Sequence, residues 1–232
     1  MNRKISFLLI VAACYFLIFS AVKFNLSVTA SSAGQLPATV IIDAGHGGED
    51  GGASTVQGTP ESEINLQISL RLEQMLAFSG IEPFMIRSIS VYSEGCDTLS
   101  EKKVSDLKNR VATVNGISNG ILISIHQNHF SQSSSCGAQV FYAKTEDSRE
   151  LAELIQSSLQ LLTPDNRRNI KPAESVYLMK HIQCPGVLVE SGFLSNPQES
   201  LLLQRADYQK KMTAAISGAV SRYLEGTLKD EV

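Results

Sequence analysis

Two histidines and two glutamates of this sequence stand where metal or acid–base chemistry could take place. Three of them follow short apolar runs that are typical of buried strands, and the fourth stands at the start of an expected helix. In chain order they are His46, Glu61, His126 and Glu190. Because ligands gather outside the carboxyl ends of strands in open α/β sheets, we expect the residues after the three strands to converge.

His46 lies in a glycine-rich loop, residues 44–52, directly after the apolar run 39–43. Glycines on both sides leave the imidazole free to face a ligand. The loop has neither the Gly-Lys-Ser/Thr ending of a phosphate loop nor the spacing of a dinucleotide-binding loop. The pattern therefore favours a metal over a phosphate as the partner of His46.

Glu61 is the expected third ligand, although a lone glutamate in a first helical turn more often serves the helix dipole. The connection from His46 is short and folds back from the same strand end, so both side chains can reach one point. Glu63 faces another side of the helix and is the second choice. Two imidazoles and one carboxylate with an open fourth position form a catalytic zinc set. We predict zinc bound by His46, Glu61 and His126.

Glu190 ends the apolar run 186–189, where a carboxylate is costly unless it is paired or used. It is well placed as a general base beside a metal-activated water. Asn128 and His129 follow His126 closely and are candidates for substrate binding.

Strands and helices alternate along the chain. Strands are expected at 39–43, 81–87, 121–125, 138–143 and 186–189, with a short extended piece at 176–179. Helices are expected from Pro60 to Gly80, at 103–115, at 147–162, after Asn196, and at 207–224, with a basic polar loop at 163–171. This order predicts a single three-layer α/β domain whose mostly parallel sheet of about six strands is flanked by helices.

The amino terminus predicts export. Arg3 and Lys4 precede residues 5–22, which carry no charge and just suffice, at ~1.5 Å per residue, to cross a ~30 Å hydrocarbon layer. Residues 1–25 are interpreted as a signal-anchor or signal peptide, 26–37 as a tether and 38–226 as the catalytic domain. The positive flank stays cytoplasmic, so the domain would lie outside the cytoplasm, either anchored or released by cleavage.

Composition argues against two other classes of protein: nucleic-acid binders, and proteins built on disulfides or on a thiolate zinc site. A formal net charge of -3 and the lack of a basic stripe argue against nucleic-acid binding. Cys14 lies in the apolar segment, and Cys96, Cys136 and Cys184 form neither a disulfide framework nor a thiolate zinc site.

Four segments resemble the four motifs of the zinc-dependent N-acetylmuramoyl-L-alanine amidases, the Amidase_3 family. They are residues 43–48, 61–66, 124–128 and 189–196. The resemblance runs from about Val40 to Tyr223. It implies that His46, Glu61 and His126 are zinc ligands, that Glu190 is the catalytic glutamate, and that the substrate is the amide between N-acetylmuramic acid and L-alanine in peptidoglycan.

The likeness is closer still to the spore-cortex, germination-specific subgroup. It rests on residues 102–111, 137–142 and 176–179, whereas Ala44 departs from the proline usual in the family. The subgroup implies a step towards muramic-δ-lactam, in the forespore intermembrane space of a spore former. A peptidoglycan deacetylase acting in sequence and an accessory exported protein are the partners it suggests.

Two alternatives remain open from the residues alone. One is a membrane-tethered wall-binding module that keeps the fold without cutting, although a binder has no need of all four polar residues. The other is a zinc carboxypeptidase or sugar deacetylase on the same polymer.

Some members of the family carry a regulatory helix after the strand matching 138–143. The short connection at this place in the present sequence predicts an open site.

Overall fold

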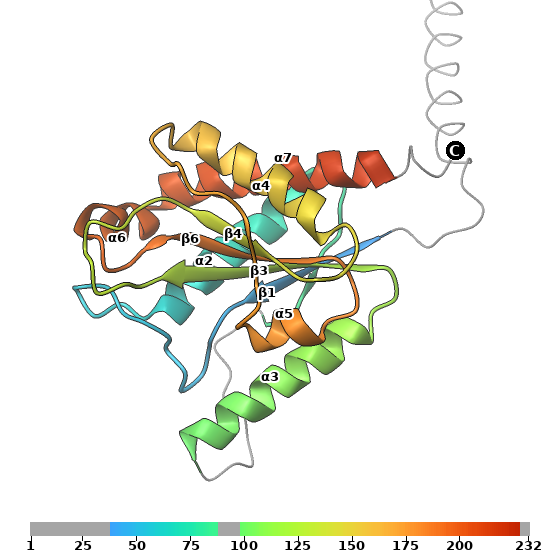
Figure 1. Ribbon diagram of the computed structural model, residues 1–232, viewed down its shortest axis with the longest axis horizontal. Coiled ribbons are helices and arrows are strands. Elements are labelled where there is room, and N and C mark those ends of the chain that lie inside the picture. The colour runs from blue at the N-terminus through green and yellow to red at the C-terminus, as the bar shows by residue number, and fades with distance from the viewer. Residues whose placement is uncertain (1–37, 88–97, 228–232) are drawn as a thin grey trace, which may run out of the picture. The chain divides into compact units, whose positions relative to one another are not determined.

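A six-stranded sheet organises the chain, with the strand order β2-β1-β3-β6-β4-β5 (Figure 1). The computed structural model describes residues 38–87 and 98–227. The strands are β1 (Thr39–Ala44), β2 (Phe84–Met85), β3 (Gly120–Asn128), β4 (Gln139–Tyr142), β5 (Lys171–Pro172) and β6 (Gly186–Phe193). Strands β2, β1, β3 and β6 are parallel, while β4 pairs antiparallel with β6 and parallel with β5. The expected α/β fold with a mostly parallel sheet is confirmed.

Helices cover both faces of the sheet and form the two outer layers of the three-layer fold (Figure 1). They are α2 (Glu61–Phe78), α3 (Leu99–Asn115), α4 (Ser148–Leu162), α5 (Tyr177–His181), α6 (Pro197–Leu203) and α7 (Ala206–Thr227). Alternate residues of β3 show the division: Ile123 packs with α2, α4 and α7, whereas Leu122 packs with α3 and α5. Both side chains are fully buried, which explains why the central strands read as continuous apolar runs.

The two central strands are longer than their apolar cores suggested. β3 continues through His126 to Asn128, and β6 continues through Glu190 to Phe193. His126 and Glu190 are direct partners in the parallel ladder. The strands were expected to end where polar residues begin, but the ladder continues and carries these side chains to the sheet edge.

Three local expectations were wrong. Residues 176–179 were expected to be extended, but α5 occupies this place and buries Leu178 and Met179. Lys171 was assigned to a loop, yet β5 pairs there with Phe141 of β4. The strand expected at 81–87 is only two residues long, because β2 pairs with β1 at Phe84 and Met85 alone. Elements this short are fixed by their pairing with other parts of the fold, and they leave almost no hydrophobic periodicity in the sequence.

The expected anchor and tether, residues 1–25 and 26–37, lie outside the described residues. Within residues 38–87 and 98–227, no helix has both the length and the apolar character needed to span a bilayer.

The buried face of α2 gives a test of the core. Leu72 is fully buried between the sheet and α7, whereas Phe78 at the end of the same helix is 92% exposed. Leu72→Ala is expected to lower the free energy of unfolding by about 2–5 kcal/mol, because it removes buried methyl groups and leaves a cavity. Phe78→Ala is the matched control and should change it by less than about 0.5 kcal/mol. Urea unfolding followed by circular dichroism measures both, and equal effects would contradict the burial.

Candidate metal centre

Glu61 is the first residue of α2, and its carboxylate is held from several directions. Oε2 accepts a hydrogen bond from the backbone N–H of Ala53 at 3.1 Å. Oε1 accepts from the backbone N–H of Gln127 at 3.1 Å and from Asn65 Nδ2 at 3.2 Å. The side chain is buried and lies at the positive end of the helix dipole. These contacts fix the carboxylate in one orientation at the edge of the sheet.

Both histidines approach this carboxylate. His126 Nδ1 lies 3.1 Å from Glu61 Oε1, and His46 Nε2 lies 3.4 Å from the same oxygen. Burial by itself would raise the pKa of Glu61, but the two imidazoles outweigh it and hold that pKa well below its usual range. Glu61 is therefore an anion at neutral pH.

His46 is presented by a strained loop. Its backbone has a φ of +59°, the left-handed region that non-glycine residues seldom occupy. Its Nδ1 is 2.8 Å from Asp50 Oδ2, which leaves Nε2 directed at Glu61. Burial alone would lower the pKa of His46, but hydrogen bonds and charge from Glu61 and Asp50 raise it to about 9. A carboxylate behind the imidazole is the usual means of orienting a metal-binding histidine.

His126 is packed tightly against the same loop. A Cβ atom at Gly45 would overlap the His126 imidazole, so only glycine allows this approach. The ring centroids of His126 and His46 are 4.9 Å apart, edge to face. The closeness of the loop explains why His126 turns Nδ1 towards Glu61.

The three side chains fit a metal ion. Their ligand atoms, one from each of His46, Glu61 and His126, all lie within 4.8 Å of one another. A tetrahedral ion with bonds of ~2.0–2.1 Å holds its ligand atoms roughly 3.3 Å apart. The two separations from Glu61 to the histidines, 3.1 and 3.4 Å, lie close to that value. The set of residues predicted from the sequence therefore comes together at one point.

Glu190 stands beside this group without a partner of its own. It neighbours His126 across the β3–β6 ladder, and its Oε2 is enclosed with no hydrogen-bond partner among the described residues. Burial raises the pKa of Glu190 to about 7, with the charge of His126 opposing the rise. A carboxyl group with a pKa near neutrality can both accept and return a proton.

The other sequence candidates lie at the rim. Asn128 ends β3, and its side-chain Oδ1 accepts a hydrogen bond from the backbone N–H of His129, which is exposed. Substrate binding by Asn128 and His129 stays a prediction. Glu63 is exposed and accepts a hydrogen bond from Gln67, so it does not join the two histidines.

Two arginines that the sequence did not single out, the buried Arg110 and the half-buried Arg87, support the loop. Arg110 of α3 donates to the Asp43 carboxylate, to the Ala44 carbonyl at 3.0 Å and to the His46 carbonyl at 2.7 Å. Arg87 donates to the carbonyls of Ala44 and Gly45 at 2.9 and 3.1 Å. Three successive loop carbonyls are thus fixed from one side.

The carboxylate of Asp43, at the end of the strand that leads into the loop, balances the positive charge of the Arg110 guanidinium. Its Oδ2 accepts a hydrogen bond from Ser124 at 2.6 Å, and the side chain is almost completely buried. Burial would raise the pKa of Asp43, but the Arg110 guanidinium and the Ser124 hydroxyl keep it lowered. Asp43 was visible in the sequence as a strand-end carboxylate, whereas Arg110 lies 67 residues away and only the fold brings it there.

The centre is open to solvent. His46 and His126 are partly exposed, and residues 143–147 alone connect β4 to α4, without an inserted helix. A partly exposed His-Glu-His set with an unpaired glutamate, at the carboxyl edge of a parallel sheet, defines the class of metal-dependent hydrolases.

The comparisons with known proteins specify the family. The profile of the N-acetylmuramoyl-L-alanine amidases, Amidase_3, matches residues 40–222, and the chain belongs to this family. It is 35% identical over 188 residues to the germination-specific N-acetylmuramoyl-L-alanine amidase of Bacillus subtilis, covering 79% of this chain and 78% of the relative.

Solved structures agree with this assignment. The CwlD amidase from Clostridioides difficile, solved in complex with the GerS lipoprotein, is 39% identical with a TM-score of 0.78, covering 81% of this chain and 98% of that one. The catalytic domain of the amidase CwlV from Bacillus (Paenibacillus) polymyxa is 27% identical with a TM-score of 0.70, covering 81% and 98%. The resemblance expected from the motifs is confirmed.

Replacement of the buried guanidinium tests the support of the loop. Arg110→Gln is expected to lower the free energy of unfolding by about 3–5 kcal/mol, because Asp43 is left as a buried, unpaired charge. Metal affinity should fall by about 10- to 100-fold, since the His46 carbonyl loses its donor.

The control is the double variant Asp43→Asn with Arg110→Gln. It removes both charges, so it should recover part of the stability without recovering metal affinity. Urea unfolding and metal titration measure the two quantities separately. Recovery of both in the double variant would show that Arg110 acts only through charge balance.

The raised pKa of His46 predicts a pH-dependent metal affinity. In the metal-free protein the imidazole is protonated below about pH 9, and a metal must displace that proton. The apparent affinity should therefore fall about tenfold for each pH unit below 9, as measured by competition with a chromophoric chelator. Asp50→Asn removes one of the groups that raise this pKa and should shift the onset of the fall to lower pH. An affinity that is constant from about pH 6.5 to 8.5 would contradict the assignment.

Proposed function

We propose that this protein is a zinc-dependent amidase of spore-cortex peptidoglycan that cleaves the amide bond between N-acetylmuramic acid and L-alanine. The observation that carries the proposal is the convergence of His46, Glu61 and His126 beside the unpaired carboxylate of Glu190. The amidase family supports the bond that is cleaved. The germination-specific relative supports a role in germination. The cortex as the substrate and muramic-δ-lactam as the destination of the product follow from the resemblance to the spore-cortex subgroup.

Zinc would be held by His46, Glu61 and His126, and when bound it supplies Lewis-acid chemistry that activates water and stabilises negative charge at the amide carbonyl. Zinc is preferred over other divalent ions because two imidazoles and one carboxylate, with a free fourth position, suit its tetrahedral geometry.

Glu190 moves the proton in this mechanism. Its Oε2 takes a proton as the water oxygen bonds to the amide carbon, and the pKa of about 7 makes the carboxyl group suitable for this step. When the carbon–nitrogen bond breaks, the same oxygen returns the proton to the nitrogen of the leaving L-alanine. Asp50 and the backbone contacts of Glu61 keep the neighbouring side chains in place throughout.

Export and partners belong to the same proposal. Residues 1–25 would carry the catalytic domain across the cytoplasmic membrane, as an anchor or a cleaved signal, with 26–37 as the tether. Alkaline extraction of membranes separates an anchored form from a released one. The relative in complex with the GerS lipoprotein suggests that an accessory exported protein binds this chain as well, which co-purification from sporulating cells tests.

Removal of the proposed base gives the sharpest test of the mechanism. Glu190→Gln is expected to lower kcat by about 10²–10⁴-fold while zinc content stays at the wild-type level, because Glu190 moves a proton and binds no metal. Glu63→Gln is the control: it changes an exposed glutamate near the start of α2 and should leave the rate within about twofold. Turnover of the Glu190→Gln variant at the wild-type rate would show that the role assignment is wrong.

Mass spectrometry of digested cortex peptidoglycan identifies the bond. New L-alanine amino termini indicate the amidase, loss of terminal residues a carboxypeptidase, and loss of acetate a deacetylase. Binding without any product would favour the wall-binding module.

A further inference from the structure

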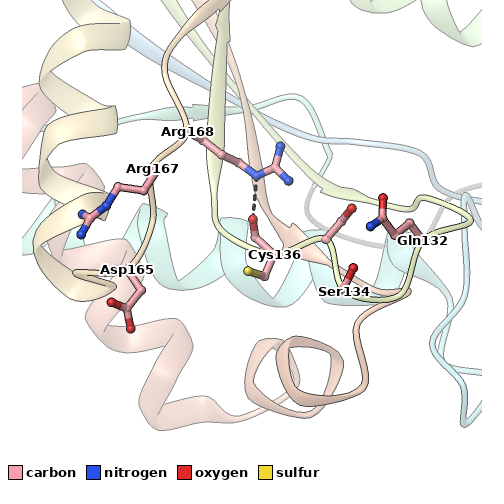
Figure 2. A pocket seen from close by; sticks show the side chains of 7 residues that line it. Gln132, Ser134, Cys136, Asp165, Arg167 and Arg168 are labelled. Carbon is pink, nitrogen blue, oxygen red and sulfur yellow. Dashed lines mark hydrogen bonds between the residues drawn. The ribbon is translucent and has the colours of Figure 1, made fainter.

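A cavity of about 350 Å³ is lined by two loops (Figure 2). One loop supplies Gln132, Ser134, Ser135 and Cys136 after β3, and the other supplies Asp165, Arg167 and Arg168 before β5. Every lining residue except Cys136 has a polar or charged side chain, and none of His46, Glu61, His126 and Glu190 lines the cavity. The mechanism described above assigns it no role.

Arg168 is the fixed cation of this cavity. Its Nε donates to the Cys136 carbonyl at 2.6 Å, and Nη1 lies 3.3 Å from Gln139 Oε1. The guanidinium lies over the ring of Phe193, 4.4 Å from the centroid, and its own backbone N–H donates to Asn166. An arginine held in this way loses little entropy when it binds an anion.

The contacts of Arg168 connect the cavity to the reacting centre. Gln139 of β4 is the direct antiparallel partner of Glu190, and Phe193 is three residues beyond Glu190 on β6. Directly opposed residues have Cβ atoms about 5 Å apart on the same face of a sheet. Arg168 thus contacts the side chain that neighbours the proposed base.

The charge of the cavity favours an anion. Arg167 and Arg168 face a single lining carboxylate, Asp165. In Figure 2, Gln132 and Ser134 lie on one side of Arg168, while Arg167 and Asp165 lie on the other. Glu199 is close enough to interact with Arg168, but its carboxylate already accepts hydrogen bonds from the backbone N–H groups of Gly137 and Phe193. Gln132 and Ser134 add hydrogen-bonding groups to the lining next to the guanidinium.

We propose that Arg168, with Gln132 and Ser134, binds the free carboxylate of the stem peptide that follows the scissile amide. The inference rests on the proposed amidase function and names a specificity-determining residue for it. In peptidoglycan the residue after L-alanine is a glutamate joined through its γ-carboxyl group, so its α-carboxylate is free. That anion lies one residue beyond the bond that is cut, and one extended residue spans about 3.5 Å. Arg168 is connected to the reacting centre through Gln139, the antiparallel ladder partner of Glu190.

Two matched substrates test the proposal in the intact, zinc-loaded protein. One is a muramoyl stem peptide with the free α-carboxylate, and the other carries the α-carboxamide at the same position. Wild-type protein is expected to have a kcat/KM about tenfold higher for the carboxylate, because a charge-assisted contact with a guanidinium is stronger than a neutral one. In Arg168→Gln this ratio should fall to about one, mainly through KM.

Controls separate recognition from folding. Arg168→Lys keeps the charge and should retain part of the preference. Arg149→Gln removes an exposed arginine that pairs with Glu153 and should keep the whole ratio. Zinc content and the unfolding temperature of each variant show whether the fold is intact. If wild-type protein cuts both substrates equally well, or if Arg168→Gln keeps the preference, the subsite proposal is overturned while the amidase stands. If neither substrate is cut, the proposed function itself fails.

Discussion

The orientation of one carboxylate, that of Glu61, is the constraint on which the centre depends. It is buried, it is an anion, and both histidines approach the same one of its oxygens. A buried anion is expensive unless every lone pair is used, and here two backbone N–H groups, an asparagine and two imidazoles share that task. The same contacts that satisfy the charge bring the candidate ligands together. Satisfying one helix-start glutamate and building the site are therefore a single structural requirement.

The loop that carries His46 needs support that its own sequence cannot provide. Glycines permit its shape but do not hold it, and the left-handed backbone of His46 is intrinsically unfavourable. Arg110 and Arg87 provide the support by donating to consecutive carbonyl oxygens, and Asp43 balances the charge from the strand below. The site is thus anchored to the face of the sheet that α3 covers, although Glu61 arrives from the opposite layer. The metal centre lies where the two layers meet at the carboxyl edge.

This arrangement separates the functions of neighbouring side chains. His46, Glu61 and His126 are engaged with one another, whereas Glu190, next to His126 in the ladder, keeps an oxygen without a partner. Burial raises its pKa towards neutrality, while the imidazoles keep that of Glu61 low. Two carboxylates at one sheet edge acquire different properties because donors surround that of Glu61, whereas that of Glu190 is buried with one oxygen that has no hydrogen-bond partner among the described residues.

The sequence by itself determined the fold class and predicted His46, Glu61 and His126, which the fold brings together, and Glu190, which it places beside His126. Apolar runs that end in His126 and Glu190 are visible as a local pattern, and a parallel sheet must bring such ends to one edge. Tertiary structure alone decided the extensions of β3 and β6, the helical turn of α5, and the short strand β5. It also decided the roles of Arg110, Arg87 and Arg168, whose partners are carbonyl oxygens and rings distant along the chain. The physical reason is that side-chain periodicity records which face of an element is buried. A hydrogen bond between segments that are far apart in the chain leaves no such pattern in the sequence.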